Sequence, residues 1–275
     1  MKKSVVVIGA AFAVLLVTRP AAAADLRPPV YTAAPQIVAA PSWTGFYIGV
    51  NTGYIRDHVN ASGQALPMPA SGGTAVLSSQ SFEPSGWLGG GQLGYNYQWQ
   101  YLVLGVEADI QASEVDGDSS TYFTNPTNPR NGALGFGSNL RAFGTLRGRV
   151  GYAFGHALFY ATGGLIVGYL NERVNWDFTA PTPPVAYLAS WNRTAAGGVW
   201  GAGVEYEFAH PVSLKIEALG YHLGSDSTVV NGSAPGGSPN GTPSPGSFTQ
   251  QTTGWLVRVG LNYRFGSAYA PVITK

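Results

Sequence analysis

Two segments of this sequence partly match patterns that bind phosphate or metal ions. Residues 89–94 satisfy G-x-G-x-x-G, the glycine pattern of dinucleotide sites. That site needs a preceding strand, a following helix and a later acidic residue, whereas here a pattern typical of an aromatic strand follows directly. Residues 114–118 group three carboxylates without the full spacing of a calcium loop. We therefore expect no cofactor, and a solvated acidic loop rather than a divalent-ion site.

Nucleophilic catalysis is the next chemistry to consider. The sequence contains no G-x-S-x-G motif, and no serine and histidine have a spacing that suggests a catalytic pair. The four histidines fall in or beside predicted turns and loops, and we expect them to be solvated: His58, His156, His210 and His222. The sequence thus predicts no catalytic residue and no metal ligand.

The charged residues are few but regularly placed. They make up 11% of the chain, against roughly a quarter in soluble globular proteins. Many alternate with apolar residues at a period of two, as in strands whose two faces meet different surroundings. Because a buried charge is costly without a partner, both signs on one face predict an enclosed, paired network. Its candidate members are Glu107, Asp109, Arg147, Arg149, Glu205, Glu207, Lys215, Glu217 and Arg258.

These charges need strands to hold them, and the same alternation predicts eight. Each strand has about the 9–11 residues that a tilted strand needs to cross a bilayer, or slightly more. The predicted strands are approximately 45–54, 86–98, 101–111, 140–154, 157–169, 197–208, 212–221 and 254–265.

The connections between these strands alternate in length. Three are tight, and four are long and polar: 55–85, 112–139, 170–196 and 222–253. Short turns on one side and long loops on the other are typical of transmembrane barrels. We therefore predict an all-β fold, an eight-stranded antiparallel up-and-down transmembrane β-barrel with both chain ends in the periplasm.

Aromatic residues favour the membrane version of this barrel. On the apolar face many lie at strand ends, where rings suit the boundary between lipid and water. The predicted periplasmic girdle is Phe46, Tyr97, Tyr152, Phe154, Phe208 and Phe265. The predicted outer girdle is Tyr54, Trp87, Tyr169, Trp200 and Trp255. A membrane barrel turns its apolar face out to lipid and encloses its polar face.

The N-terminus has the three parts of a secretory signal peptide. Lys2 and Lys3 precede an apolar run, 5–17, which is too short for a spanning helix, and alanines 21–23 follow. The predicted organisation is a signal peptide (1–23), a Pro/Ala-rich periplasmic tail (24–42), an outer-membrane barrel (43–265) and a C-terminal tail (266–275). There is no cysteine, and no concentrated basic face that would suggest a nucleic-acid partner.

Several segments in combination resemble a known family, the small porin-like outer-membrane immunogenic proteins. They include WTGFYIG at 43–49, GGGQLGYN at 89–96, GTLRGRVGY at 144–152 and VRVGLNYRF at 257–265. The resemblance implies an eight-stranded barrel like the membrane domain of OmpA-type proteins, found in abundant surface antigens without catalytic residues. The last strand resembles the signal read by the barrel-assembly machinery, through Arg258, Gly260, Tyr263 and Phe265.

The leading functional hypothesis is a non-enzymatic outer-membrane surface protein of a Gram-negative bacterium. Its expected partners are outer-membrane lipid, lipopolysaccharide, the assembly machinery and an unspecified loop ligand. A narrow porin for small solutes is the alternative, and a barrel lipid hydrolase is a third hypothesis. Eight strands leave an interior that side chains can fill, so paired charges predict a plugged barrel with little ion conductance.

Overall fold

The computed structural model describes residues 42–65, 76–123, 132–178, 185–231 and 245–266. All of them belong to the second of the two units into which the chain divides, Ala39–Lys275. The predicted signal peptide, nearly all of the predicted periplasmic tail and residues 267–275 lie outside the described residues, and their assignment stays a prediction. In the described part of the chain, no helix is long and apolar enough to cross a membrane.

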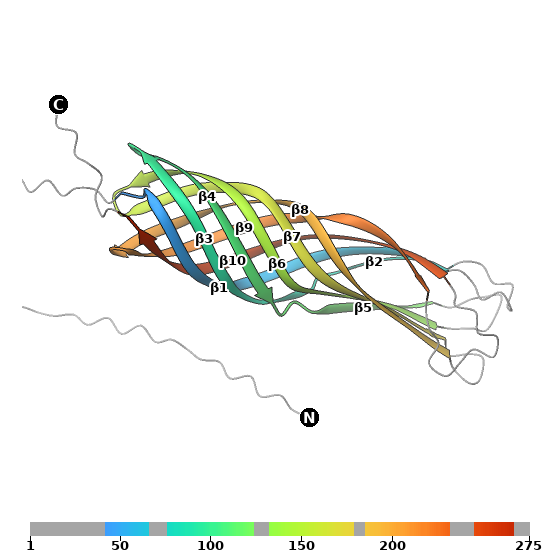
Figure 1. Ribbon diagram of the computed structural model, residues 1–275. Helices are drawn as coiled ribbons and strands as arrows, with labels where there is room; N and C mark the ends of the chain where they lie inside the picture. The colour runs from blue at the N-terminus through green and yellow to red at the C-terminus, as the bar shows by residue number, and fades with distance from the viewer. Residues whose placement is uncertain (1–41, 66–75, 124–131, 179–184, 232–244, 267–275) are drawn as a thin grey trace, which may run out of the picture. The chain divides into compact units, whose positions relative to one another are not determined.

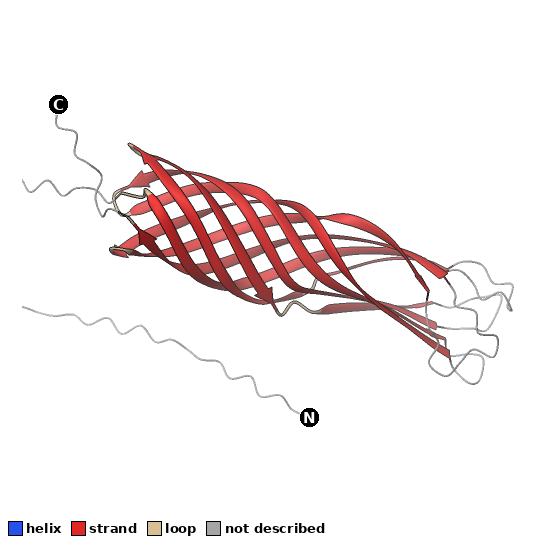
Figure 2. Ribbon diagram, viewed as in Figure 1, coloured by secondary structure: helices blue, strands red, loops and turns tan. Residues whose placement is uncertain are grey.

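Eight antiparallel strands follow one another around a ring (Figures 1 and 2). The last strand pairs with the first, from Phe46 opposite Phe265 to Ala65 opposite Gly246, and this pairing joins the two ends of the strand order. The predicted all-β class and the eight-stranded antiparallel order are confirmed. The ring strands are β1 (Gly45–Ala65), β3 (Ser85–Trp99), β4 (Leu102–Ser113), β6 (Gly132–Phe154), β7 (Ala157–Phe178), β8 (Val185–Ala209), β9 (Val212–Asn231) and β10 (Pro245–Phe265).

Two short strands lie outside the ring order. β2 (Val76–Phe82) pairs with the end of β1, and β5 (Gly117–Phe123) pairs with the beginning of β6. Six ring strands also run to 20–25 residues, well past their predicted ends. The prediction of four long polar loops is therefore wrong for a large part of those segments. We call the strand portions beyond the predicted outer girdle the extension; they are 55–65, β2, β5, 132–139, 170–178, 185–196, 222–231 and 245–253.

The sequence pattern did not predict the extension, because the apolar residues of its strands face inward and the polar residues face outward. In β1 the inward Val59 is fully buried, while the outward His58 and Asn60 are exposed. Phe248 of β10 also points inward and is 1% exposed. Strands in water bury their apolar face and expose the polar one, the reverse of a membrane barrel. A prediction that requires an apolar outward face therefore ends the strand at the girdle, although the strand continues.

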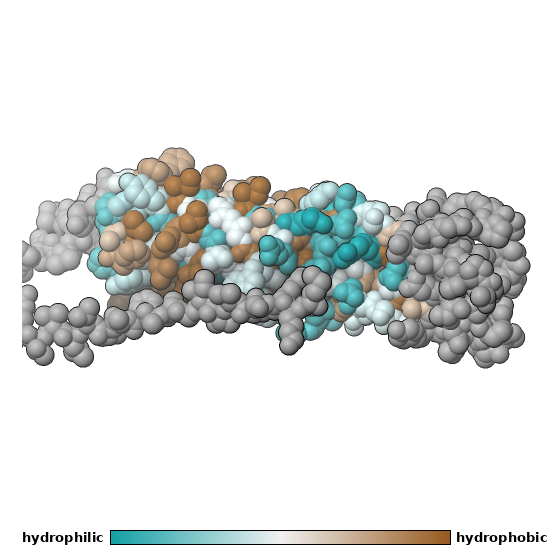
Figure 3. Space-filling view, turned by 90° about the horizontal axis from the view of Figure 1, so that it is seen from below, coloured by the Kyte–Doolittle hydropathy of each residue, from teal (hydrophilic) through white to brown (hydrophobic). Residues whose placement is uncertain are grey.

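The outward face of the ring is apolar, as predicted. All residues of both predicted girdles point outward, with 39–71% of their surface exposed in the isolated chain. Figure 3 shows brown, apolar side chains gathered on part of the wall and a teal, polar region beside them. An apolar wall of this kind needs lipid around it, because large exposed apolar patches are rare on soluble monomers.

The inward face is layered. Near the tight turns lies a buried cluster, the tight-turn cluster: Trp43, Val103, Ala153, Leu158 and Tyr160. At the level of the outer girdle lies the boundary cluster: Ile55, Leu88, Val115, Leu140, Phe143, Ile166, Leu170, Ala195, Val199, Leu219, Tyr221, Leu223 and Leu256. The extension has an apolar cluster of its own: Val59, Ala61, Phe82, Leu134, Phe136, Val174 and Phe248. The largest group of buried charges, around Glu107, occupies the ring between the first two layers.

Candidate functional site in the barrel lumen

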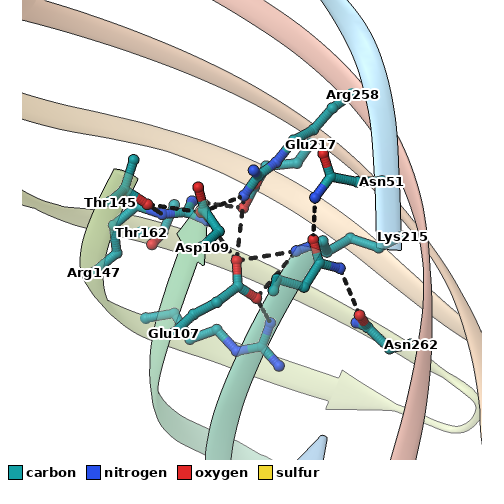
Figure 4. A network of polar contacts seen from close by, with 12 residues as sticks. Asn51, Glu107, Asp109, Thr145, Arg147, Thr162, Lys215, Glu217, Arg258 and Asn262 are labelled. Carbon is teal, nitrogen blue, oxygen red and sulfur yellow. Dashed lines mark hydrogen bonds and ion pairs between the residues drawn. The ribbon is translucent and has the colours of Figure 1, made fainter. Parts of the chain in front are cut away.

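Glu107 is the centre of the buried charge network. It lies midway along β4, and the alternation of that strand turns it inward, opposite Arg147 of β6, with which it forms an ion pair. Lys215 Nζ of β9 lies 3.0 Å from both carboxylate oxygens. Arg258 Nη2 of β10 lies 3.3 Å and Arg149 Nη1 of β6 lies 3.6 Å from a Glu107 oxygen. One carboxylate, 2% exposed, thus serves four cations from three strands (Figure 4).

Two further carboxylates share the arginines of this centre. Asp109 Oδ2 accepts from Arg147 Nη2 at 3.0 Å, from Arg258 Nη2 at 3.1 Å and from Thr145 Oγ1 at 2.7 Å. Glu217 Oε1 accepts from Arg147 Nη1 at 2.9 Å, and its Oε2 accepts from Arg258 Nε at 2.7 Å. Arg147 and Arg258 therefore each bind three carboxylates, and they tie β4, β6, β9 and β10 together across the ring.

Arg149 and Glu205 extend the network toward the tight turns. Arg149 Nε donates to Asn96 Oδ1 at 2.8 Å, and its Nη1 lies 3.4 Å from Glu205 Oε2. Glu205 Oε1 accepts from Ser213 Oγ at 2.5 Å and from Asn262 Nδ2 at 2.9 Å. Each group of this part consequently has a partner on another strand.

The network is electrically balanced. Its four carboxylates are Glu107, Asp109, Glu205 and Glu217, and its four cations are Arg147, Arg149, Lys215 and Arg258, which gives zero formal charge. Burial of charge without partners costs several kcal/mol per ion, and the mutual pairing offsets that cost. The structure thus brings eight of the nine predicted interior charges together.

Glu207 is the predicted member that stays apart. It lies near the tight-turn end of β8 and pairs with Arg264 of β10, while His210 Nδ1 lies 3.4 Å away. The guanidinium of Arg264 in turn stacks over the ring of the buried Trp43, 4.6 Å from its centroid. Glu207 therefore belongs to the closure of the tight-turn end rather than to the central network.

The residues of the predicted assembly signal lie on both faces of β10. Arg258 and Gly260 face the lumen, and Tyr263 and Phe265 face outward with ring centroids 5.0 Å apart. Only Arg258 belongs to the network, so the structure does not gather this set into one site.

Sequence reasoning missed two tyrosines of the site. Tyr47 donates to Glu107 Oε2 at 2.6 Å, and Tyr160 donates to Glu217 Oε1 at 3.1 Å. Neither belongs to the predicted girdles, and neither is predicted to face the lumen. A glycine lies opposite each of these tyrosines on the neighbouring strand and leaves room for the ring. A Cβ on Gly94 would overlap the Tyr47 hydroxyl, and one on Gly203 would overlap the Tyr160 hydroxyl. Amides also missed include Asn51 and Gln92, which hydrogen-bond each other at 2.5 Å.

The arrangement offers structural rather than reactive chemistry. Apolar layers, the tight-turn and boundary clusters, lie on either side of the charges. Among the described residues, no group of three or more acidic or histidine side chains is placed to hold a metal ion. The charges are engaged with one another, so the network is suited to stabilising and filling the barrel.

A second buried acid lies beyond the outer girdle. Asp57 follows the membrane-crossing part of β1, between the exposed Arg56 and His58, and is itself 3% exposed. It accepts a hydrogen bond from Tyr221 of β9. Burial raises the pKa of the Asp57 carboxyl to about 7, and the hydrogen bond from Tyr221 opposes that rise only in part.

This pKa predicts a pH-dependent effect of Asp57→Asn. An aspartate of ordinary pKa 3.8 loses its proton in the unfolded chain between about pH 4 and 7, while folded Asp57 keeps it. The stability of the native protein therefore falls across that window and levels off above it. The asparagine variant lacks this loss, so its advantage should grow from about zero at pH 4 to at most roughly 4 kcal/mol at pH 8.

Denaturant unfolding in detergent at a series of pH values measures this difference. Glu83→Gln is the matched control, because Glu83 is half-exposed and paired with Arg56, which holds the pKa of its carboxyl below the ordinary value. That variant should gain nothing at high pH. A pH-independent difference between wild type and Asp57→Asn would contradict the burial of a protonated carboxyl.

Comparison with known proteins places this architecture. Residues 10–265 match the family model described as outer membrane protein beta-barrel domain. The 31 kDa outer-membrane immunogenic protein of Brucella melitensis is 34% identical over 261 residues, which cover 89% of this chain and 93% of the relative. The 22 kDa outer membrane protein of Rhizobium leguminosarum bv. viciae is 28% identical over 180 residues, 65% of this chain and 63% of the relative.

Among solved structures, the outer membrane protease OmpT from Escherichia coli aligns with a TM-score of 0.45 and 10% identity. The alignment covers 82% of this chain and 98% of that one. A likeness of this size carries no information on activity. The family match over residues 10–265 and the 34% identical relative show that this chain belongs to the outer-membrane β-barrel family and is a protein of the bacterial outer membrane.

Proposed function

We propose that this outer-membrane protein is a non-enzymatic surface protein whose closed barrel anchors the extension outside the cell. The observation that carries the proposal is the balanced charge network across the lumen. Eight strands leave an interior that side chains can fill. Arg147, Arg258 and Lys215 are at most 1% exposed, and the labelled side chains converge from the surrounding strands in Figure 4.

A narrow porin would need a continuous wet path, and the layering argues against one. The charges pair with one another, and the boundary cluster covers them on the extension side. In the extension the rings of Phe136 and Phe248 meet across the interior, 6.0 Å apart. The same layers would keep a lipid substrate out of the lumen.

The matching prediction is a barrel without steady ion conductance. The mature chain, refolded in detergent and shown to be folded by its heat-dependent gel mobility, should give no stable single-channel steps in planar bilayers. A general porin inserted in the same bilayers is the positive control. Stable, large steps from the wild-type chain would overturn the closed-barrel proposal in favour of the porin.

The same preparation tests the hydrolase hypothesis. With phospholipid as substrate, the folded protein should release fatty acid no faster than heat-unfolded protein in the same detergent. Sustained turnover by the folded form alone would contradict the non-enzymatic proposal.

Two partners complete the proposal. Lipopolysaccharide is proposed to contact the rim just beyond the outer girdle, where Arg56 and His58 are half-exposed. The guanidinium of Arg56 suits the phosphates of a lipid headgroup. The barrel-assembly machinery is proposed to bind β10 during insertion, through the aromatic residues at its end.

A further inference from the structure

The ring divides at one place beyond the outer girdle. β3 and β4 pair as far as Leu88 opposite Ser113, and Glu114 N–H then donates to Trp87 O at 2.9 Å. An isolated bridge joins Ser85 to Asp116, and there the pairing between the two segments ends. Beyond it β2 pairs with β1 and β5 pairs with β6, but β2 and β5 do not pair with each other. We call this point the fork.

Pro84 and Gly117 explain the fork. In the register of the Ser85–Asp116 bridge they are the next residues to face each other. Proline has no N–H to donate to a ladder. Its ring also fills the space between the segments, since a Cβ on Gly117 would come within 2.8 Å of Pro84 Cα. Pro84 O meanwhile accepts from Asp57 N–H at 2.8 Å, so it is held on the β1 side.

The fork leaves two strands with one partner each in the described part of the chain. β2 pairs with β1 alone, and β5 pairs with β6 alone. The other edge of such a strand presents N–H and C=O groups that can pair with another chain. Proteins often protect an edge with lysine, proline or a bulge, and β5, with the sequence GDSSTYF, has none of these.

The surface around this edge is acidic. Glu114, Asp116 and Asp118 are exposed along β5 and the residues before it, whereas Val115 between them is buried. Glu83 lies on the other side of the fork. Arg173 Nη2 pairs with Asp116 at 3.0 Å, and Arg56 pairs with Glu83. These four carboxylates outnumber the two guanidinium groups that pair with them.

We propose that the fork binds an extended cationic peptide segment of a partner protein, which adds to the free edge of β5. Main-chain hydrogen bonds to β5 would supply affinity, as in other strand additions. Lysine or arginine at every second position of the segment would meet Asp118 on β5, and one at the closed end of the fork would meet Asp116 and Glu83. This inference rests on the proposed function, in which the extension is the contact surface.

A divalent ion fits the same carboxylates less well. Successive residues on one face of a strand are roughly 6–7 Å apart, so Glu114, Asp116 and Asp118 lie in a row along the surface rather than around one point. The described residues also contain no group of acidic or histidine side chains placed around a metal position. An extended chain, by contrast, has the same spacing as the carboxylates.

The test uses a fluorescent nine-residue peptide of alternating threonine and lysine, and anisotropy on the refolded mature chain in detergent. Binding should be saturable. A peptide with glutamate in place of lysine should bind at least about tenfold more weakly, as should the lysine peptide methylated on every second backbone nitrogen. Equal binding of the methylated and unmethylated lysine peptides would show charge attraction alone and overturn the strand addition.

Variants of β5 test the strand addition independently of the peptide variants. Glu114 N–H points to the fork, and because every second N–H of a strand shares a side, Ser120 N–H should point there too. Ser120→Pro should therefore lower peptide affinity at least about tenfold, whereas Ser120→Ala keeps the N–H and should bind like wild type. Equal affinities of the two variants, both folded by gel mobility, would contradict the proposal.

Sedimentation of the protein without peptide tests whether a second copy of the chain binds the edge of β5 instead. A dimer that Ser120→Pro dissociates would mean that a second copy fills the edge, and the proposal would be wrong. Bilayer conductance remains a separate measurement. An open pore with intact peptide binding would overturn the closed barrel alone, and a closed barrel without peptide binding would overturn this inference alone.

Discussion

Glu107→Ala should lower the free energy of unfolding by at least about 3–5 kcal/mol, the usual cost of removing one partner from a buried ion pair. The substitution leaves Arg147, Arg149, Lys215 and Arg258 close together with one carboxylate fewer. In the proposed closed barrel, the apolar layers on both sides would keep water from solvating the excess positive charge. Equilibrium unfolding by urea or guanidinium in detergent, followed by tryptophan fluorescence, measures the loss.

The control for this prediction is a glutamate whose side chain is exposed to solvent. Glu83 is half-exposed and pairs with Arg56, and an exposed pair contributes only about 0–1 kcal/mol. Glu83→Ala should therefore unfold almost like the wild type. If the two alanine variants lost the same amount, water would have to reach Glu107, and the closed lumen would be refuted.

The faces of the barrel wall were predictable because a wall one strand thick has only two environments. Period-two alternation assigns each residue to lipid or lumen, so Glu107 on β4 and Arg147 on β6 were placed inside without any tertiary information. Their direct opposition follows from the register of two strands joined by a long connection. That register is not present in the local sequence, and the individual ion pairs could not be derived.

The parts that were not predictable depend on a change of environment along one strand. At Ile55 of β1 the surroundings of the outward face change from lipid to water, while the strand itself continues to Ala65. Asparagine, serine and glycine there indicate a loop by composition, although valine also favours strands. Tyr47 was missed for a related reason, because an aromatic ring suits both a girdle and a lumen with a glycine opposite.

The fork shows the same limit at longer range. Pro84 lies in a predicted loop, and its missing N–H limits pairing at that position. Its consequence, two neighbouring strands that do not pair with each other, depends on Gly117, which is 33 positions away in the chain. Only the register of β3 and β4 brings these two residues opposite each other.

The second large effect is expected at the end of β10. Phe265→Ala should reduce the folded barrel in outer membranes of expressing cells several-fold, because the assembly machinery is proposed to bind the terminal aromatic of the closing strand. Phe265 points outward, is 54% exposed and lies opposite Phe46 of β1, so it closes the ring at the point where insertion would end. Heat-dependent gel mobility of membrane fractions measures the folded amount. Deletion of residues 266–275 should leave that amount unchanged.

Two comparisons separate recognition from stability. Phe154 of β6 is also an outward aromatic near the tight turns, 71% exposed, but it is not on the closing strand. Phe154→Ala should therefore accumulate like the wild type in cells. Refolded in detergent without the machinery, Phe265→Ala should reach nearly the wild-type yield, since an exposed ring contributes little to packing. If Phe154→Ala and Phe265→Ala lost the same amount of folded barrel in cells, the effect would belong to the girdle rather than to the assembly signal. The same would follow if Phe265→Ala lost as much folded protein in detergent as in cells.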